Sequence, residues 1–545
     1  MSEFTDLVSI CNETEINNDE VKEYNFDENN KLLLIRQNDR IWAIGATCPH
    51  QGAPLVKGIL GHGRIRCSRH GSCYNIRTGD IEDFPGLDSL PTYPVEIATN
   101  GEVQVRARIK DLNKIRRTKK MVEYNKSDER VFLLVGGGVA TATCAETLRQ
   151  EGYTGRIIIL CREDYLPYDR APLSKVWQGD ITELYFRDSD FYEENNIEVI
   201  LGVEAIKLDT AMRTVSCSNG QLITYDKLFI ATGSKPTRMP VNGNDLRNVF
   251  SIHDYRDLQT IMHVLKSKTN LVCVGGGFIN MEFVSSIVTK VKSVVLVCNK
   301  KYPLESTVGR DVGERLLQLY REKGVQMKME SRIKEILSED GVRISEIRTS
   351  DGYKYPCDVL IIAVGVVANT TWLIDSSLPI NADGTIDTDM HLMTLVPNIY
   401  VGGDIANAPL FSNANQRQNV KHLQMAQYHG YVAAINMAGT IKDLRAVPSF
   451  NIHLFGATFS HAGVGSINET SIYGDLKRLK YLAYLFDRDG NVTCVNTCGY
   501  DATVVNFCEL LSQGKRLHRS DVVDKSNPHQ WMEHLLDTRR TRCGC

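Results

Sequence analysis

No apolar stretch of this sequence approaches the roughly 18 residues that a membrane-spanning helix needs, so a membrane span is not expected. The first twenty residues lack the apolar core of a secretory signal and the arginines of a transit peptide. Ser2 stands where an N-myristoylation motif requires glycine. These absences predict a cytoplasmic protein, with the mitochondrion as the alternative.

A strong charge of either sign is also lacking. The 545 residues carry 63 Lys and Arg against 66 Asp and Glu, a formal net charge of −3. Nucleic acid is therefore not an expected partner, because its recognition uses a basic field. An apolar content of 42% is that of a globular protein, and the length suits roughly three to four domains.

The cysteines lack the pattern of a disulfide framework. Fifteen of them are scattered at irregular spacings, many inside apolar segments, which indicates buried free thiols. We also find no grouping of two histidines and a carboxylate that would hold a mononuclear iron, so an oxygenase is not expected.

What the sequence does contain is a pair of tight Cys–His loops. The first reads C-P-H at 48–50 and the second C-S-R-H at 67–70, with sixteen residues between them. Two thiolates and two imidazoles in this arrangement suit a [2Fe–2S] cluster of the Rieske kind, in which two Cys hold one iron and two His the other. A Cys2His2 zinc site is the alternative, although zinc pairs usually lie farther apart than C-x-H. The predicted metal ligands are Cys48, His50, Cys67 and His70.

The sequence around these loops predicts a small all-β domain over residues 1–112. Residues 31–46 are rich in β-formers, and residues 102–109 alternate between apolar and polar side chains. A basic segment at 113–130 is interpreted as a linker, for which a solvated run of charge is a simpler explanation than a docking strap.

At residue 131 an apolar strand runs into a glycine turn and then into a helix. In G-G-G-V-A at 136–140, Gly136 makes the turn and Gly138 lets the backbone approach a pyrophosphate at the helix N-terminus. Thr141 replaces the third glycine of the dinucleotide fingerprint. A second strand ends beside Glu163, whose carboxylate could bind an adenosine ribose, and the long spacing favours FAD.

The same strand, glycine turn and helix return about 140 residues later, with Asn280 at the third glycine position. Two such turns imply two nucleotide domains. The motifs A-T-G at 231–233 and V-G-G-D at 401–404 mark where the chain leaves and re-enters the first of them. Asp404 would accept a hydrogen bond from a ribityl hydroxyl of FAD. The other predicted nucleotide contacts are Ala231, Gly233, Gly275 and Gly277.

Together with P-Y-D-R-A-P-L-S-K at 167–175, these motifs resemble the pyridine-nucleotide flavoprotein reductases that serve small ferredoxins. With the Cys–His loops in front, the chain is similar to the Rieske-bearing member of the apoptosis-inducing factor family over about residues 30–540. The resemblance implies that Arg170 and Lys175 lie at the flavin and that Glu282 pairs with Lys175 at its reactive edge. Lys175 and Glu282 are the predicted catalytic residues, because the lysine would stabilise negative charge on reduced flavin.

This order of motifs predicts a multidomain architecture, with an all-β Rieske domain, two α/β nucleotide-binding domains of the reductase type and an α+β C-terminal domain. Asn451 stands where the family often has an aromatic residue, and Cys494 and Cys498 are interpreted as strand residues. The expected limits are 1–112 (Rieske), 113–130 (linker), 131–250 with 369–445 (FAD), 251–368 (NAD(P)) and 446–545 (C-terminal).

The function that follows is electron transfer from a reduced nicotinamide dinucleotide, through FAD, to the cluster and on to an unidentified acceptor. Residues 163–190 contain no cysteine, so disulfide-reductase chemistry is not expected. The alternative is a redox-responsive signalling protein with weak turnover, motivated by Thr141, Asn280 and Asn451. The family also suggests a role in apoptosis, and either a monomer or a homodimer is compatible with the sequence.

Two finer expectations concern the cofactors. No acid lies at 298–301, where one would select NAD, and Lys300 or Lys301 could meet a 2′-phosphate, so NADPH should serve about as well as NADH. In respiratory Rieske proteins a Ser and a Tyr at the positions of Ser72 and Tyr74 donate hydrogen bonds to sulfur, which raises the potential. The disulfide that clasps respiratory Rieske loops cannot form here, because its positions hold Ala53 and Arg69.

Overall fold

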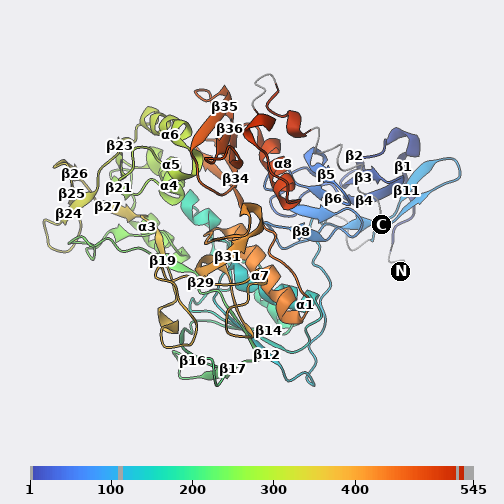
Figure 1. Ribbon diagram of the computed structural model, residues 1–545, viewed down its shortest axis with the longest axis horizontal. Helices are drawn as coiled ribbons and strands as arrows, with labels where there is room; N and C mark the ends of the chain where they lie inside the picture. The colour runs from blue at the N-terminus through green and yellow to red at the C-terminus, as the bar shows by residue number, and fades with distance from the viewer. Residues whose placement is uncertain (1–3, 109–113, 523–526, 533–545) are drawn as a thin grey trace. The chain divides into compact units, whose positions relative to one another are not determined.

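The computed structural model describes residues 4–108, 114–522 and 527–532, and the chain divides into two compact units (Figure 1). Unit 1 comprises residues 1–121, 447–450 and 500–545, and unit 2 comprises residues 122–446 and 451–499. Among the described residues, no helix is both long enough and apolar enough to cross a membrane.

Unit 1 is built from antiparallel sheets, which confirms the predicted all-β fold around the Cys–His loops. The ligand loops leave β4 (Arg40–Gly45) and β6 (Arg64–Arg66), and apolar side chains of these sheets pack beneath them. The three sheets run β1 (Val8–Asn12), β11 (Glu102–Val105), β10 (Val95–Ile97); β2 (Glu20–Asn25), β3 (Lys31–Gln37), β4, β9 (Thr92–Tyr93); and β5 (Ile59–Gly61), β6, β7 (Cys73–Asn75), β8 (Ile81–Asp83).

One helix from the far end of the chain also belongs to unit 1. Helix α8 (Asp501–Ser512) lies in the segment for which the sequence predicts an α+β domain, and it contacts β5 (Figure 1). The segment 446–545, expected as one C-terminal domain, is thus divided between the two units.

Unit 2 contains two parallel five-stranded sheets, each built around one of the glycine turns. Helix α1 (Val139–Gln150) follows the first turn and packs on α7 (Leu423–Ala438), whereas α4 (Phe278–Ile287) follows the second. The first sheet runs β14 (Ile197–Ile200), β13 (Arg156–Leu160), β12 (Val131–Val135), β18 (Lys227–Ile230), β30 (Ile399–Val401). The second runs β20 (Val249–Phe250), β27 (Val359–Ile362), β21 (Asn270–Val274), β22 (Ser293–Val297), β23 (Gln326–Lys328).

Smaller elements complete unit 2. The helices are α2 (Ser189–Glu194), α3 (Tyr255–Val264), α5 (Glu305–Val308) and α6 (Arg310–Glu322). Three-stranded sheets join β15 (Ala205–Asp209), β16 (Thr214–Cys217), β17 (Leu222–Thr224); β24 (Ile333–Leu337), β25 (Glu346–Thr349), β26 (Lys354–Pro356); and β29 (Ile386–Asp387), β31 (Ala406–Leu410), β32 (Gln416–Gln418). The strands β19 (Ser234–Pro236) and β28 (Val366–Ala368) pair with one another.

An antiparallel sheet follows the nucleotide-binding sheets, in the segment expected to be an α+β domain. Its hairpin at Asp489–Asn491 joins β36 to β37, and Cys494 and Cys498 lie in β37, which confirms their interpretation as strand residues. The order is β33 (Ser449–Leu454), β34 (Ala457–Gly463), β37 (Val492–Cys498), β36 (Lys480–Phe486), β35 (Glu469–Asp475).

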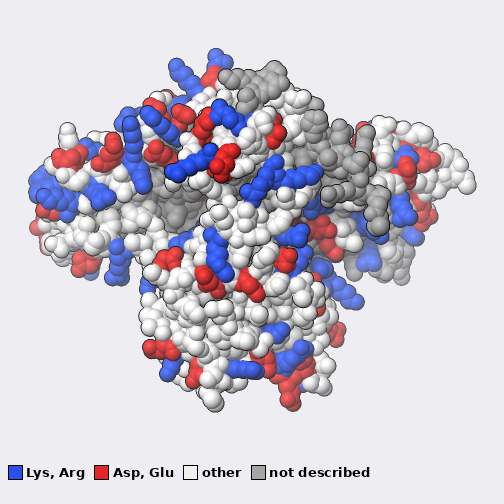
Figure 2. All heavy atoms as spheres, in the orientation of Figure 1, with Lys and Arg blue, Asp and Glu red and all other residues white. Residues whose placement is uncertain are grey.

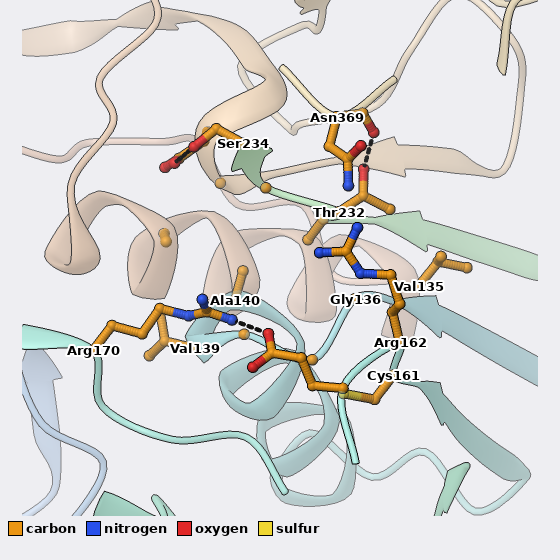
Figure 3. Close-up of a pocket in the computed structure, with 18 of the residues that line it drawn as sticks. Val135, Gly136, Val139, Ala140, Cys161, Arg162, Arg170, Thr232, Ser234 and Asn369 are labelled. Atoms are coloured by element: carbon orange, nitrogen blue, oxygen red, sulfur yellow. Dashed lines mark hydrogen bonds and ion pairs between the residues drawn. The ribbon is translucent and has the colours of Figure 1, made fainter. Parts of the chain in front are cut away.

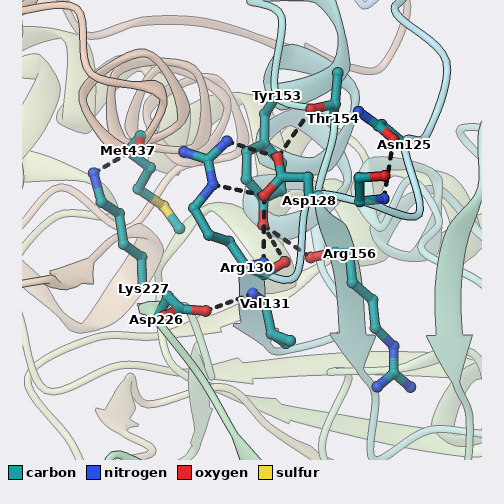
Figure 4. Close-up of polar contacts among 12 residues, drawn as sticks. Asn125, Asp128, Arg130, Val131, Tyr153, Thr154, Arg156, Asp226, Lys227 and Met437 are labelled. Carbon is teal, nitrogen blue, oxygen red and sulfur yellow. Dashed lines mark hydrogen bonds and ion pairs between the residues drawn. The ribbon is translucent and has the colours of Figure 1, made fainter.

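The basic segment that we expected to be a solvated run of charge is anchored at both of its ends. Arg117 donates to the carbonyls of Leu90 (2.8 Å) and Thr78 (2.7 Å) within unit 1. Arg130 forms an ion pair of 2.7 Å with Asp128 within unit 2 (Figure 4). Backbone carbonyls offer Arg117 fixed partners, so Arg117 is not a freely solvated charge. Arg130 has a carboxylate partner, but its side chain is 56% exposed, which agrees with a solvated charge.

Charges of both signs are mixed on the face of the molecule that Figure 2 draws. On the face drawn in Figure 2, Lys and Arg side chains are interspersed with Asp and Glu. This agrees with the formal net charge of −3.

Candidate functional site

The two ligand loops of unit 1 share one backbone design. In the first, Cys48 N–H donates to the Ala53 carbonyl (2.8 Å) and Gly52 N–H donates back to Cys48 (3.0 Å). The second repeats this pattern, with Cys67 N–H to Ser72 (2.8 Å) and Gly71 N–H to Cys67 (3.0 Å). Gly71 has φ +83°, a left-handed conformation that favours glycine, so this turn needs the residue that the sequence supplies.

The loops bring the predicted metal ligands together in pairs of the same type, cysteine with cysteine and histidine with histidine. The side chains of Cys48 and Cys67 lie next to one another, and each residue is 1% exposed. The rings of His50 and His70 lie with their centroids 4.9 Å apart. His50 Nδ1 is buried and has no hydrogen-bond partner within the described ranges, and burial lowers the pKa of His50 to about 4, so the imidazole is neutral.

A thiol pair beside an imidazole pair suits two irons better than one zinc. Across the parts of the chain that the structure describes, no three His, Cys, Asp or Glu side chains lie close enough to hold a single metal ion. A Rieske cluster takes two sulfur ligands on one iron and two nitrogen ligands on the other, which is the division seen here. Cys48, Cys67, His50 and His70 therefore fit a [2Fe–2S] cluster.

The two hydroxyls after the second loop have different partners. The Tyr74 hydroxyl lies 3.3 Å from Cys48 Sγ, and burial raises the pKa of Tyr74, which keeps it a proton donor. Ser72 instead donates to the Pro85 carbonyl at 2.6 Å. The expectation that both hydroxyls aim at sulfur is therefore wrong for Ser72, because a backbone acceptor lies within reach of its single proton.

In unit 2 the first glycine turn opens onto a cavity of about 280 Å³ (Figure 3). A Cβ on Gly136 would lie 2.2 Å from the Ala231 carbonyl oxygen, so the turn can pass β18 only as glycine. A Cβ on Gly138 would meet nothing within 4 Å, and α1 begins at the next residue. An open helix N-terminus of this kind suits a pyrophosphate.

Every residue predicted to bind FAD, except Lys175, lines this cavity. Glu163 accepts from Tyr168 (2.8 Å) and forms an ion pair with Arg170, while Asp404 accepts from Ser234 (2.6 Å). The predicted residues that line it are Gly136, Gly138, Glu163, Arg170, Ala231, Gly233 and Asp404. The polar side chains that line this cavity and the open glycine turn fit FAD.

The second glycine turn lines a separate cavity of about 820 Å³ in the same unit. A Cβ on Gly275 would lie 2.2 Å from the Ala363 carbonyl, and one on Gly277 would meet nothing within 4 Å, which repeats the geometry of the first turn. Lys300 lines this cavity, together with Arg332. The repetition fits a second dinucleotide, NAD(P)H.

The missing third glycines have a structural explanation. The Thr141 hydroxyl lies 2.8 Å from the carbonyls of both Gly136 and Gly138. The Asn280 amide donates to the Val274 carbonyl at 2.7 Å and to that of Gly275 at 2.9 Å. Both side chains therefore tie the helix to its own glycine turn, so their presence does not argue against nucleotide binding.

The predicted catalytic pair is formed within unit 2. Lys175 Nζ lies 3.2 Å from Glu282 Oε2, and the Glu282 side chain is 8% exposed. Ser174 also donates to Glu282, at 2.5 Å, and the backbone N–H of His453 donates at 3.4 Å. Lys175 comes from the segment after the FAD-binding turn, whereas Glu282 lies on α4 after the second turn.

Sequence reasoning missed several residues of these sites. Ser174 was missed although it precedes Lys175, and only the fold reveals that it faces Glu282. The side chains of His253, Asn369, Trp372 and His422 line the first cavity, and Arg332 lines the second. They come from loops far from the glycine turns, and their residue types follow no recognisable spacing.

Comparison with known families agrees with this geometry. Residues 130–430 match the family model of the pyridine nucleotide-disulphide oxidoreductases, and residues 6–94 match that of the Rieske [2Fe-2S] domain. Apoptosis-inducing factor 3 of Mus musculus is 33% identical over 520 residues, which span 94% of this chain and 85% of that protein. The chain belongs to the Rieske-bearing apoptosis-inducing factor family.

Reductases of other systems match the second part of this family's architecture. The benzene 1,2-dioxygenase system ferredoxin–NAD(+) reductase subunit of Pseudomonas putida is 31% identical over 285 residues, covering 52% of this chain and 68% of that subunit. The crystal structure of the ferredoxin reductase for the CYP199A2 system from Rhodopseudomonas palustris superposes with a TM-score of 0.69 at 25% identity. It covers 73% of this chain and 98% of that one.

Membership of the family assigns the cofactors and the type of enzyme. The chain is an FAD-dependent NAD(P)H oxidoreductase of the ferredoxin-reductase type that also carries a Rieske [2Fe–2S] cluster. Electron transfer from NAD(P)H is its activity.

Proposed function

We propose that the chain passes electrons from NAD(P)H through FAD to its own Rieske cluster, and from there to an outside acceptor. The observation that carries this proposal is the Lys175–Glu282 pair of 3.2 Å, which joins the segment after the FAD-binding turn to the helix after the second glycine turn. Two dinucleotide cavities in one unit, with a lysine held between the elements that form them, suit hydride transfer from one nucleotide to the other.

The proposed roles of the residues follow from their contacts. Glu282 holds Lys175 from one side and Ser174 restricts the carboxylate from another, so the lysine charge is kept in one place. FAD, when bound, accepts a hydride and releases its electrons singly. A fixed ammonium group stabilises the negative charge that arrives with the hydride. In unit 1, Cys48, Cys67, His50 and His70 would hold the cluster.

The position of the Rieske domain supports the second half of the route. The Pseudomonas relative is by name a ferredoxin–NAD(+) reductase subunit of a dioxygenase system. Here an iron–sulfur domain precedes the reductase in the same polypeptide. We infer that the Rieske cluster takes the place of the ferredoxin, and that the final acceptor is a small redox partner.

Rapid mixing of the anaerobic holoprotein with NADH or NADPH tests this proposal. Flavin absorbance at 450 nm should fall first, and the electron paramagnetic resonance signal of a reduced Rieske cluster should follow. Lys175→Met should slow the first phase by about tenfold or more while FAD content stays unchanged, because one fixed charge contributes at least ~1.4 kcal/mol to the transition state. An unchanged first phase would remove Lys175 from the site.

Steady-state kinetics with NADH and with NADPH test the choice of nicotinamide. We propose that Lys300, with Arg332 in the same cavity, binds the 2′-phosphate of NADPH, since no acid lies at 298–301. Lys300→Ala should raise KM for NADPH and leave KM for NADH unchanged. A wild type that uses NADH alone would contradict this assignment.

Two further proposals concern the biological setting. Every cysteine in the described part of the chain is free, which supports a reducing compartment such as the cytoplasm, and fractionation of cells would test it. The name of the mouse relative supports a role in apoptosis. Expression of the wild type and of Cys67→Ser in cultured cells would test whether such a role depends on electron transfer.

A further inference from the structure

Helix α8 delivers a buried carboxylate to the base of the second ligand loop. Glu509 lies 443 residues from Arg66 in the chain, yet its Oε2 accepts from Arg66 Nε (3.2 Å) and Nη2 (3.1 Å). Its Oε1 accepts from Arg64 at 2.6 Å. The side chains of Glu509 and Arg66 are 4% and 5% exposed, so both charges are removed from water and depend on each other.

The Arg66 guanidinium connects this carboxylate to the loop itself. Arg66 directly precedes the predicted ligand Cys67, and its Nη1 donates to the Gly71 carbonyl at 2.8 Å. Gly71 directly follows the predicted ligand His70. The same guanidinium also donates to Asp83 at 2.6 Å, so three acceptors fix its plane.

A non-covalent anchor has a clear use at this position. All cysteines within the described residues are free, so no disulfide links the two ligand loops. The turn that contains Gly71 is closed by only two backbone hydrogen bonds, from Gly71 N–H to the Cys67 carbonyl (3.0 Å) and from Cys67 N–H to the Ser72 carbonyl (2.8 Å). A guanidinium held by the buried carboxylate of Glu509 and the partly buried carboxylate of Asp83 supplies the rigidity that a covalent clasp would otherwise give.

Helix α8 is itself firmly seated in unit 1. Phe507 is fully buried and lies edge-on to Trp531, with ring centroids 6.5 Å apart. Cys508, the residue before Glu509, is also buried. The helix therefore presents Glu509 from a fixed backbone, which is what a positioning residue requires.

We propose that helix α8 is a working part of the Rieske unit, in which Glu509 positions the second ligand loop through Arg66. This inference rests on the proposed cluster ligands. It goes beyond them because it makes the cluster's environment depend on a residue near the other end of the chain. Removal of the Glu509 charge leaves Arg66 with Asp83 as its remaining carboxylate partner, loosens the turn 67–71 and leaves the positive charge of Arg64 without this partner near the cluster. Since reduction adds negative charge, the potential then rises.

The experiment compares full-length wild type with Glu509→Gln, Glu509→Asp and Glu96→Gln. Glu96 is the control, because it is an exposed acid of unit 1 on β10, in a different sheet from β6, and its partner at 3.3 Å is the partly exposed Arg106. Iron, labile sulfide and flavin are counted, the cluster potential is measured by protein-film voltammetry, and amide hydrogen exchange is followed in peptides that cover 66–74.

We expect Glu509→Gln to exchange faster over 67–72 and to shift the potential upward, while Glu96→Gln matches wild type. Glu509→Asp keeps the charge and should restore the potential in part. Identical exchange and potential in Glu509→Gln and Glu96→Gln would overturn the inference. If Glu509→Gln loses its cluster but keeps FAD, α8 is confirmed as part of the Rieske unit, whereas loss of both cofactors would refute that role. Absence of a cluster in the wild type would instead refute the proposed ligands.

Discussion

Tyr74 and Ser72 follow the second ligand loop, and the structure gives their hydroxyls different partners. Tyr74 faces the sulfur of Cys48 at 3.3 Å, whereas Ser72 is bound to a backbone carbonyl at 2.6 Å. Both residues are fully buried, so neither hydroxyl can exchange its partner for water. From the sequence alone, the two hydroxyls were expected to play the same role. The acceptors around them give them different hydrogen-bond partners.

At this scale we predict that Tyr74→Phe lowers the cluster potential. A hydrogen bond to a charged sulfur is worth about 1–2 kcal/mol, or roughly 40–90 mV for a one-electron couple. Ser72→Ala serves as the comparison and should change the potential by much less. Protein-film voltammetry on both variants checks this, and a larger shift for Ser72→Ala would contradict the hydrogen-bond assignment.

At the scale of elements, the first glycine turn, between β12 and α1, contains two glycines with different roles. Gly136→Ala should destabilise the fold by about 2–4 kcal/mol, because its Cβ would overlap the Ala231 carbonyl and its φ is strained for alanine. Gly138→Ala should leave apoprotein stability nearly unchanged and weaken FAD binding by about tenfold or more, ~1.4 kcal/mol, since the new methyl group occupies open space at the helix N-terminus. Thermal unfolding and flavin titration of the apoproteins measure both effects. Equal stability losses in the two variants would show that the space beside Gly138 is structural.

Helix α8 gives a second prediction at this scale, on pH. Burial raises the pKa of Glu509, but Arg66 and Arg64 outweigh it and lower the pKa to about 2. Asp83 also faces this group, and the nearby thiols of Cys73 and Cys508 stay neutral, because burial raises their pKa to about 12 and about 11. A carboxyl with a depressed folded pKa stabilises the fold above its unfolded pKa, near 4.5, and loses that contribution as pH falls towards 2.

At pH 7 the free energy of unfolding should therefore be larger for wild type than for Glu509→Gln. The depressed pKa of Glu509 accounts for on the order of 3 kcal/mol of this difference. The difference should shrink as pH is lowered from 5 to 3. Urea unfolding at several pH values measures it, with Glu96→Gln as the reference for a charge change at the surface. A difference that stays constant over this range would show that Glu509 is not the titrating group.

At the scale of the whole molecule, the predicted cluster ligands lie in unit 1 and the FAD cavity lies in unit 2. Each unit has its own sheets and its own buried core. Loss of one cofactor therefore should not unfold the other unit.

We predict that Cys67→Ser loses iron and labile sulfide but retains one FAD per chain and its reduction by NADPH. Cys11→Ser, a change at a partly exposed cysteine of the same unit, should retain both cofactors. Metal analysis and flavin absorbance after heat release give the two ratios. Flavin loss in Cys67→Ser alone would mean that the two units do not fold independently.

The sequence by itself determined the features that depend on near neighbours in the chain. The C-x-H and C-x-x-H loops, the two glycine turns and the strand–helix alternation are local, because a turn or a helix N-terminus is set by a few consecutive residues. The replacement of the third glycines was visible too. Its meaning was not, since the carbonyls that Thr141 and Asn280 bind become acceptors only when the turn is folded.

Only the tertiary structure decided which distant residues meet. Spacing and composition do not predict that segment 446–545 is divided between the two units. They also do not predict that Ser174 donates a hydrogen bond to Glu282, or that Glu509 forms an ion pair with Arg66. Such pairs form because buried charges need partners wherever packing brings them. The carboxylate that reaches the base of the second ligand loop is thus supplied from the far end of the chain by the packing of one helix.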